Sequence, residues 1–448
     1  MPPVNEPAPL DAIPERVDAD GKAPYPRAWF ATGMLALLAA IAILDRNIVT
    51  LLVDPIKHHF VLSDVQMSLL IGAAFAVPFG VLGIPAGWAV DRFSRRSVIA
   101  LGICAWSVAT MATGAVRSFG GLVVARSFVG AGDATIGPAN SSLLSDLFPK
   151  GKLALPMAIT GMGNKIGQGG ALIVGGWLAS MIDPTKNIAL PLLGETAGWQ
   201  LIFLLVGLPG LLIVPFVFLI PEPSRALAEG KNQPDSSFVA FFAYWKANAR
   251  FLLPHHLGFL FLVAMSNAVM AWTPAFLIRS HGWSAATVGS WLGTALVIAP
   301  LMGMPLHGMF ADMLYRRGWR DIHLRYPIVT AILGVPLPIC GFLAPIPEAT
   351  VICVGLFLFL VSGYASLPLT ALMTVLPGRF RGKGTSIVGL FCGAGGVMLG
   401  PLLVGYITDA IIRDPAKVGI SVMVSLVVFL LLFVLSFLMA LPALRRSV

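Results

Sequence analysis

Five ionisable side chains stand within long apolar segments of the sequence: Asp45, Arg46, Arg126, Asp133 and Lys165. A charge at the middle of a bilayer costs roughly 2.5–3.5 kcal/mol, and such residues are usually retained for a function. A carboxylate beside cations is able to exchange a proton, and a cation is able to hold an anionic group. The five side chains sum to +1 with both acids ionised and to +3 with both protonated. They predict a site that couples proton binding to the movement of an organic anion.

Each of the five residues has a predicted role. Asp45 and Asp133 are the expected proton-coupling acids, and Arg46, Arg126 and Lys165 are expected to bind substrate or to tune these acids. At ~1.5 Å of rise per residue, both acids and the lysine lie about 18–24 Å above the cytoplasmic ends of their helices, and Arg126 about 33 Å. The acids and the lysine are therefore expected to share one layer. The alternative is a structural ion-pair network that locks the N-terminal half.

The composition places these residues in a membrane. Of 448 residues, 57% are hydrophobic and only 11% are charged, whereas a soluble globular protein carries about 25% charge. Mean hydropathy is +0.85. Because so few charges cannot cover the surface of a 47.4 kDa particle in water, most of the surface must face lipid. A soluble enzyme, a disordered chain and a secreted disulfide scaffold are excluded.

Twelve apolar segments are long enough to cross a bilayer, which takes about 20 residues of helix. The expected fold class is an all-α integral membrane protein with twelve transmembrane helices in two six-helix bundles. In chain order we expect a disordered cytoplasmic tail at 1–26, the N-terminal bundle at 27–221, a cytoplasmic linker at 222–250, the C-terminal bundle at 251–443 and a cytoplasmic tail at 444–448.

The distribution of Lys and Arg predicts the orientation. If the N-terminus is cytoplasmic, 21 of the 30 basic residues fall in cytoplasmic tails and loops, six on the opposite side and three within the membrane. Basic residues are enriched in cytoplasmic loops, so both termini are expected in the cytoplasm. This topology accounts for the net charge of +9, and no nucleic-acid partner is expected.

A charged motif occurs once in each half. Gly87-x3-Asp91-Arg92-x2-Arg95-Arg96 follows the second span, and Gly308-x3-Asp312-x3-Arg316-Arg317 follows the eighth, 221 residues later. Two six-helix halves related by repetition are a transporter architecture. Glycine allows close helix approach, and the charges are able to pair across the halves in one state and separate in another. The predicted gating residues are Gly87, Asp91, Arg92, Arg95, Arg96 and Asp312.

These motifs carry a family resemblance. The stretch 87–96 resembles the signature loop between helices two and three of the major facilitator superfamily, with Ser94 where that pattern usually has Gly. Arg126-x3-Gly130-x-Gly132 resembles a second motif of the same superfamily. The resemblance implies the major facilitator fold, in which helices one, four and five line a central cavity between two pseudo-symmetric bundles.

Within the superfamily, the chain resembles the bacterial spinster-like branch along nearly its whole length. The matching stretches include Asp45-Arg46-Asn47, 126–133, Gly198-Trp199 and 399–405, with Asp133 where that branch usually has Glu. Resemblance to proton-coupled organic-anion transporters is weaker and centres on Asp45-Arg46 and 126–133. A location in the bacterial inner membrane is what the branch implies.

The C-terminal half has no comparable charge within its apolar segments. Asn267, Trp272 and Tyr364 stand among apolar residues there, and together they are expected to form a neutral, aromatic wall that binds substrate. Taken singly, each is also explained as a packing or helix–helix contact. A charged N-terminal half facing an apolar C-terminal half suits an amphipathic substrate, and resemblance to lysolipid and sphingolipid carriers implies the same.

Enzyme, metal and cofactor signals are lacking in the sequence. Its four cysteines have neither metal-ligand nor disulfide spacing. Gly161-x-Gly163-x3-Gly167 lacks the dinucleotide-binding spacing, and 378–385 is one residue too short for a phosphate-binding loop. We therefore expect no enzyme activity, no cofactor and no metal.

The sequence thus predicts a secondary active transporter, acting as a monomer, that moves an anionic, amphipathic and lysolipid-like molecule by alternating access with proton coupling. Its expected partners are this small organic substrate, protons and membrane lipids. One alternative is a proton-coupled importer of a polar organic acid such as a sugar acid, against which the sparse polar residues of the C-terminal half count. Another is a membrane sensor with a transporter fold, although the 222–250 linker and short tails leave little room for signalling.

Overall fold

The structure, a computed structural model, describes residues 25–148, 152–190, 194–222, 238–377 and 380–447. Most of the expected tail at 1–26 lies outside these residues, and its last two residues begin the first helix. Of the expected linker, 223–237 also lies outside them. The last helix continues to Ser447, so the expected tail at 444–448 is helical as far as it is described.

The N-terminal half crosses the bundle six times. Its crossing segments are α1 (Tyr25–Asn47) with the 3-10 turn η1 (Ile48–Thr50), α3 (Asp64–Ile71) with α4 (Ala73–Arg92), α5 (Arg95–Thr113), α6 (Phe119–Asp133) with α7 (Ile136–Leu147), α8 (Ala154–Met181) and α9 (Gly198–Val217).

The C-terminal half also crosses six times, which confirms the prediction of twelve spans. Its crossing segments are α11 (Ala249–His281), α12 (Ala285–Arg316), α13 (Ile322–Gly334) with α14 (Pro336–Leu343), α15 (Pro347–Val361) with η3 (Ser362–Ala365) and α16 (Leu367–Val375), α17 (Arg381–Ile387) with η5 (Val388–Ala394), α18 (Gly395–Tyr406) and η6 (Ile407–Ile412), and η7 (Pro415–Lys417) with α19 (Val418–Ser447).

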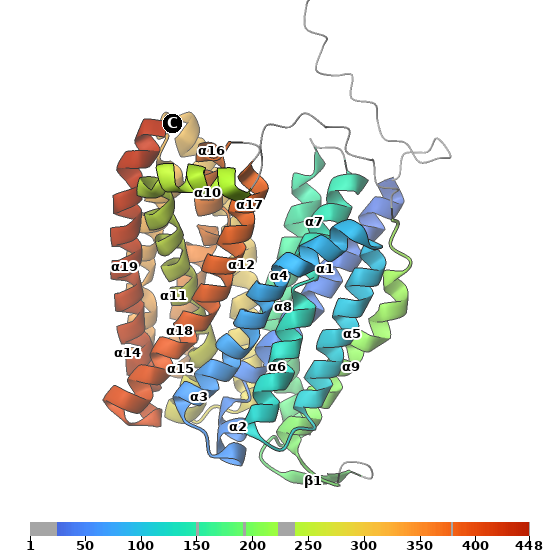
Figure 1. Cartoon of the computed structure of the whole chain (residues 1–448). Coiled ribbons are helices and arrows are strands. Elements are labelled where there is room, and N and C mark those ends of the chain that lie inside the picture. Colours follow the sequence, from blue (N-terminus) through green and yellow to red (C-terminus); the bar gives the residue numbers. More distant parts are fainter. Residues whose placement is uncertain (1–24, 149–151, 191–193, 223–237, 378–379, 448) are drawn as a thin grey trace, which may run out of the picture.

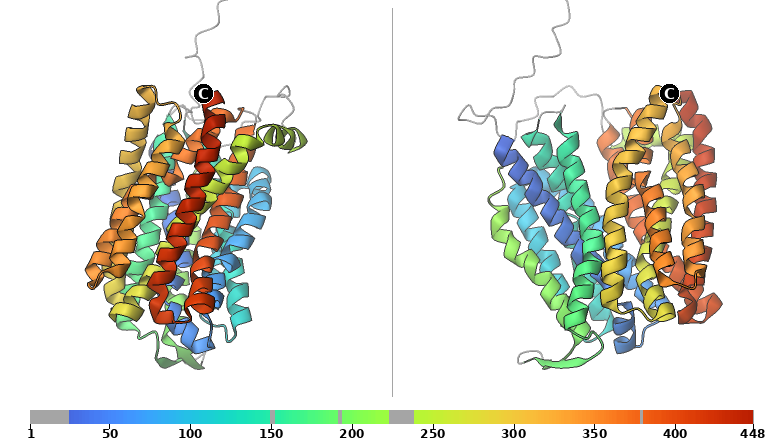
Figure 2. Two further views of the ribbon diagram at one scale, coloured as in Figure 1. Left: turned by 90° about the vertical axis from the view of Figure 1, so that its left-hand side faces the viewer. Right: turned by 180° about the vertical axis from the view of Figure 1, so that it is seen from behind.

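The two halves stand side by side, the blue-to-green half beside the yellow-to-red half (Figures 1 and 2). We call the end where α1 begins and α19 ends the terminal end, and the opposite end the hairpin end. The helix α10 (Phe238–Ala247) lies across the terminal end, and α2 (Val53–Phe60) lies at the hairpin end (Figure 1). The strands β1 (Asn187–Leu190) and β2 (Gly194–Ala197) pair antiparallel there, a small departure from the all-helical expectation. Their pairing satisfies backbone groups that no helix takes up.

Two spans that correspond in the repeat are broken at similar places. The fourth is interrupted between Asp133 and Ile136, and the tenth at η3. Pro138 and Pro368 follow these interruptions by about one turn. A proline removes one helical hydrogen bond and its ring presses on the carbonyl four residues earlier, which accounts for both breaks.

Close packing of α8 against α12 joins the two halves. A methyl group at Gly169 would lie 2.3 Å from the carbonyl oxygen of Gly293, and one at Gly289 would lie 2.3 Å from that of Leu172. Only glycine permits helices to approach this closely, because its backbone carries no side chain. These contacts lie in the part of α8 and α12 nearer the hairpin end, where the halves meet.

Candidate functional site

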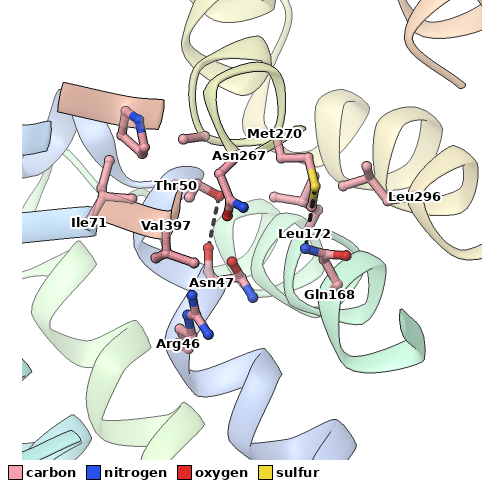
Figure 3. A pocket seen from close by; sticks show the side chains of 12 residues that line it. Arg46, Asn47, Thr50, Ile71, Gln168, Leu172, Asn267, Met270, Leu296 and Val397 are labelled. Carbon is pink, nitrogen blue, oxygen red and sulfur yellow. Dashed lines mark hydrogen bonds between the residues drawn. The ribbon is translucent and has the colours of Figure 1, made fainter. Parts of the chain in front are cut away.

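A central pocket lies between the halves, enclosed by helices of both (Figure 3). The N-terminal half contributes Arg46, Asn47, Thr50, Ile71, Gln168 and Leu172, and the C-terminal half contributes Asn267, Met270, Ala271, Leu296, Val397 and Pro401. The two walls touch where the Gln168 amide nitrogen lies 3.4 Å from the Met270 sulfur. The N-terminal wall is mostly polar and the C-terminal wall mostly apolar.

Arg46 brings a positive charge to this pocket. Among the described residues that line it, Arg46 is the one with an ionisable side chain. It lies in the last turn of α1, where the helix dipole favours a cation. Its guanidinium carbon lies 4.2 Å from the centre of the Phe75 ring, so cation–π attraction holds one face. The side chain is half-buried and points to the pocket region between the halves.

Arg126 lies behind the N-terminal wall of the pocket and donates hydrogen bonds to the backbone of α1. It is fully buried, and its two terminal nitrogens donate to the carbonyl oxygens of Arg46 at 2.7 Å and Asp45 at 3.4 Å. The last carbonyls of a helix lack partners within it, and α1 ends at Asn47. The rise per residue along the helices predicted that Arg126 lies about 9 Å from the level of Asp45 and Asp133. Its long side chain spans that difference, and Arg126 thereby fixes the end of α1.

Asp45 faces the interior of the N-terminal half. Neighbouring helical residues point about 100° apart, so Asp45 turns away from the pocket while Arg46 turns toward it. Asp45 is fully buried, and neither carboxyl oxygen has a hydrogen-bond partner in the described part of the chain. Thr110 of α5 lies on the same side, and its hydroxyl group acts on the Asp45 carboxyl group. The charges of Arg126 and Asp133 act on Asp45.

Asp133 ends α6 at the break in the fourth span. Its residue is 8% exposed, and the charge of Arg46 acts on its carboxyl group. The break before Pro138 places Asp133 at the end of a helix instead of in its middle. The structure therefore brings Asp45, Arg46, Arg126 and Asp133 together beside the pocket.

The other predicted substrate-binding residues are dispersed. Lys165 is half-buried on α8, one turn nearer the terminal end than Gln168, and does not line the pocket. Asn267 lines the C-terminal wall. Trp272 is fully buried, and its indole nitrogen donates to the Pro401 carbonyl at 3.2 Å. Tyr364 lies in η3, and its side chain falls outside the described part of the structure.

We expect Gly130→Ala to lower the stability of the protein by about 1–3 kcal/mol, the usual cost of overpacking. An added methyl group would lie 2.2 Å from the carbonyl oxygen of Phe75, whose ring contacts Arg46. Thermal unfolding in detergent measures the change. Gly120→Ala on the same helix is the control, because a methyl group there would meet nothing within 4 Å. Equal unfolding midpoints for the two variants would contradict this assignment.

The predicted gating residues lie at the terminal end, where two of them, Arg95 and Arg96, pair with acids of the N-terminal half. Arg95 pairs with Asp146, and Arg96 lies 3.4 Å from Glu222. The hydroxyl of Ser94, which replaces the usual glycine, donates to Glu222 at 2.5 Å.

The remaining gating residues are exposed or have open space beside them in this conformation. Asp91, Arg92 and Asp312 are exposed. A methyl group at Gly87 or at its counterpart Gly308 would meet nothing within 4 Å, so the close helix approach expected there is absent from this state. The gating roles stay predictions.

A charged network at the hairpin end was missed by the sequence analysis. Arg279 of α11 pairs with Asp54 and Asp64 of the other half, and Lys57 also pairs with Asp64. Each residue looks like an ordinary loop or helix-end charge when read alone. A pairing across 215 residues has no signal in a single sequence. The one usable hint was acidic and basic residues at the ends of spans expected to meet.

Comparison with known proteins identifies the family. Residues 35–324, more than half of the chain, match the model of the Major Facilitator Superfamily. The chain belongs to the major facilitator superfamily. It is therefore a membrane transporter with this fold and not an enzyme.

Individual relatives within the superfamily are distant. The chain is 27% identical to an MFS-type efflux pump of Mycolicibacterium smegmatis, over 87% of this chain and 86% of the relative. It is 23% identical to a D-galactonate transporter of Escherichia coli, over 89% of this chain and 93% of the relative.

Among solved structures, the fold is similar to a bacterial homologue of the human lysosomal transporter spinster. That structure is inward-facing and unoccupied, with a TM-score of 0.78 and 23% identity over 94% of this chain and 97% of that one. This agrees with the spinster-like resemblance and supports the twelve-helix arrangement.

Proposed function

We propose that this secondary transporter carries an organic anion, with Arg46 holding the anionic group in the central pocket. The observation that carries the proposal is a single cation on the described pocket wall, between halves that must move relative to each other. A guanidinium offers two parallel donors that match a carboxylate or phosphate. Asn47, Gln168 and Thr50 supply neutral polar groups beside it.

Proton coupling rests on the acids beside this arginine. Asp45 is buried beside Arg126, and neither of its carboxyl oxygens accepts a hydrogen bond by distance and angle among the described residues. A buried carboxylate that lacks such bonds costs several kcal/mol. Proton uptake removes that cost. Asp133 feels the charge of Arg46, so an anion that binds Arg46 changes the charge that Asp133 faces. Asp45 and Asp133 titrate as a coupled group in this proposal.

An amphipathic anion is the substrate class that the pocket favours. Met270, Ala271, Leu296 and Val397 form an apolar C-terminal wall opposite the polar one. A hydrocarbon part would lie against this wall while the anionic head binds Arg46. A lysolipid-like molecule has both parts.

A polar organic acid is the second candidate, and two observations favour it. Asn267 adds an amide to the C-terminal wall, so polar groups stand on both sides of the pocket. A relative that matches along most of its length is named a D-galactonate transporter. A sugar acid would use the amides of Asn47, Gln168 and Asn267 for its hydroxyl groups.

The membrane orientation follows from the charges. With both termini in the cytoplasm, the terminal end is cytoplasmic and the hairpin end faces the opposite side, as the excess of basic residues in terminal-end loops supports. The bacterial inner membrane is the proposed location. Gly87, Asp91, Arg92, Arg95, Arg96 and Asp312 then form the proposed cytoplasmic gate.

A ligand screen on the purified protein tests the substrate class. Lysolipids, fatty acids and sugar acids are added singly at two pH values, and the shift in thermal unfolding is measured. A ligand present at 100 times its Kd stabilises the folded state by about 2.7 kcal/mol, so a true ligand is visible. Stabilisation by lysolipids or fatty acids supports the amphipathic anion, and stabilisation by sugar acids supports the second candidate. Stabilisation by cationic compounds alone would contradict both.

We expect Lys165→Gln to weaken binding of the screened anion by no more than about tenfold. Lys165 lies one turn from the pocket on the terminal-end side, so it attracts the anion on its path without forming the main contact. Thermal-shift titration with the ligand found by the screen measures the effect. A loss as large as that caused by replacing Arg46 would show that Lys165 is itself the principal site.

A further inference from the structure

Six arginines gather at the terminal end of the C-terminal half. They come from the end of α12, from the loop and first turn of α13 that follow it, and from the end of α19 (Figure 2). The helix α13 packs against both α12 and α19, so these segments are neighbours in space. We call this surface the basic corner, and its residues are Arg316, Arg317, Arg320, Arg325, Arg445 and Arg446.

Asp321 joins two elements of the basic corner. One of its carboxyl oxygens lies 2.8 Å from Nε of Arg325 on α13 and 2.6 Å from Nε of Arg445 on α19. The Asp321 side chain is 9% exposed, whereas those of the two arginines are 40% and 53% exposed. A guanidinium has five N–H donors, so both arginines keep donors for a further anion.

Positive charge exceeds negative charge in this corner. Beside its six arginines stand two acids, Asp312 and Asp321, which leaves a net charge of +4. Arg316, Arg317 and Arg320 are exposed, and none has an acid within ion-pairing distance in the described part of the chain. Two arginines of the corresponding motif in the N-terminal half do pair with acids. The excess charge of the basic corner therefore favours an anionic partner from outside the chain.

Aromatic rings lie among these arginines. Trp319 stands in the loop between α12 and α13 and is 51% exposed, and the guanidinium carbon of Arg325 lies 5.8 Å from the centre of its ring. The guanidinium carbon of Arg320 lies 4.9 Å from the centre of the Tyr315 ring. Cation–π attraction acts at these distances. An exposed tryptophan at the end of a membrane span is typical of the head-group layer, where lipid meets water.

The basic corner continues into an apolar surface that runs along the spans. Val329 and Leu333 follow Arg325 on the same face of α13 by about one and two turns, and both are exposed. On α19, Met439 precedes Arg446 by about two turns on the same face and is exposed as well. Large apolar side chains exposed on membrane-spanning helices contact lipid tails. The arginines at the ends of these faces therefore lie at the level of lipid head groups.

We propose that the basic corner binds the phosphate head group of an anionic phospholipid, in the leaflet that adjoins the terminal end. A guanidinium binds phosphate through two parallel hydrogen bonds. Clusters of about four to eight basic residues directly beside a membrane span are typical of anionic-lipid binding. The acyl chains of the bound lipid lie along α13 and α19, and its head group joins the α12–α13 loop to the end of α19. This binding is independent of which anion is transported and of whether protons drive transport.

Native mass spectrometry of the purified full-length protein measures lipid binding, since it resolves single bound lipids. Phosphatidylglycerol carries a net negative charge, whereas phosphatidylcholine has the same phosphate but no net charge. We expect the wild type to bind phosphatidylglycerol about tenfold or more tightly than phosphatidylcholine. Equal affinities for the two lipids would contradict the proposal.

Inorganic phosphate separates a lipid site from a site for free anions. Thermal unfolding in detergent is measured with phosphatidylglycerol, with inorganic phosphate at millimolar concentration, and with both together. We expect the lipid to raise the unfolding midpoint and phosphate neither to raise it nor to remove the effect of the lipid. Loss of the lipid effect in the presence of inorganic phosphate would assign the basic corner to a free anion and overturn the lipid assignment.

A triple variant tests the residues of the site. The changes Arg317→Gln, Arg320→Gln and Arg446→Gln, made together, leave both ion pairs of Asp321 in place, so the fold is expected to persist. We expect its affinity for phosphatidylglycerol to fall about tenfold or more, to the level of phosphatidylcholine. Lysine at the same three positions keeps the charge without the paired donors, and an intermediate loss is expected.

A control of equal charge separates the basic corner from a general effect of net charge. Lys186→Gln, Arg413→Gln and Lys417→Gln together also remove three cations, but these are exposed residues of the hairpin end, and both lysines lie beside acids of their own loops. We expect this variant to bind phosphatidylglycerol as the wild type does. Wild-type affinity in the glutamine variant of the basic corner, or an equal loss in the hairpin-end control, would overturn the proposal.

Discussion

Replacing Arg46 by glutamine is expected to weaken binding of the transported anion by about 100-fold or more. Truncating one partner of a buried charge pair costs about 2–5 kcal/mol, and each 1.4 kcal/mol is a tenfold change in affinity. Arg46 is the one ionisable residue among the described residues that line the central pocket. Titration of the purified variant with the ligand found by the screen measures the loss.

Two variants control this result. Arg46→Lys keeps the charge but not the two parallel donors, so an intermediate loss is expected. Lys186→Gln removes an exposed cation of the hairpin-end loop and is expected to bind as the wild type does. Wild-type affinity in Arg46→Gln would exclude Arg46 as the anion site and would leave the pocket without a charged ligand contact on its described wall.

Replacing Asp133 or Asp45 by asparagine is expected to reduce the pH-gradient-driven accumulation of the transported anion to about a tenth of the wild-type level or less. Asparagine has nearly the same shape as aspartate but cannot carry a titrating proton. Anion exchange across the membrane at equal pH needs no net proton movement, so it is expected to persist. Uptake into proteoliposomes, with and without a pH gradient, separates the two activities.

A different result is expected for Asp133→Asn and Asp45→Asn if the two acids only form a structural ion-pair network. If Asp45 and Asp133 only lock the N-terminal half, asparagine should lower the thermal stability and reduce exchange and driven uptake together. Glu195→Gln in β2 is the matched control, because that residue is exposed and lies far along the chain from the cluster. Unchanged driven uptake in both Asp133→Asn and Asp45→Asn would contradict proton coupling at this site.

The span count and the charge cluster were both predictable, since each depends on local sequence. About 20 apolar residues make a span whatever their partners, and a charge within a span stands out against its neighbours. Asp45, Arg46, Arg126 and Asp133 were found in this way. Their precise partners were not, because Arg126 reaches the backbone carbonyls of Asp45 and Arg46 instead of a carboxylate.

The division between pocket and packing could not be read from the sequence. Asn267 and Trp272 are five residues apart on one helix, yet the first lines the pocket and the second is buried against Pro401. Which face of α11 meets α18 depends on tertiary packing. Arg279 was likewise indistinguishable from an ordinary basic residue at a helix end until the fold placed Asp54 and Asp64 beside it.

The role of each glycine depends on how the fold packs around it. Gly169 and Gly289 permit close contact between the halves here, whereas Gly87 and Gly308, which the repeat motif singled out, face open space. A sequence shows that a glycine is present but not which conformation uses it. The residues of the terminal-end gate are therefore best tested in the state that is closed at that end.

Current recordings from proteoliposomes on a solid support test the central claim most directly. The anion identified by the screen is applied to wild-type protein and to Arg46→Gln, Asp133→Asn and Lys186→Gln at equal pH on both sides. We predict a transient current in the wild type and in Lys186→Gln, an electrical response in Asp133→Asn that no longer changes with pH, and a response in Arg46→Gln only at concentrations about 100-fold higher. Equal currents at equal concentrations in the wild type and Arg46→Gln would contradict an anion transporter built around Arg46.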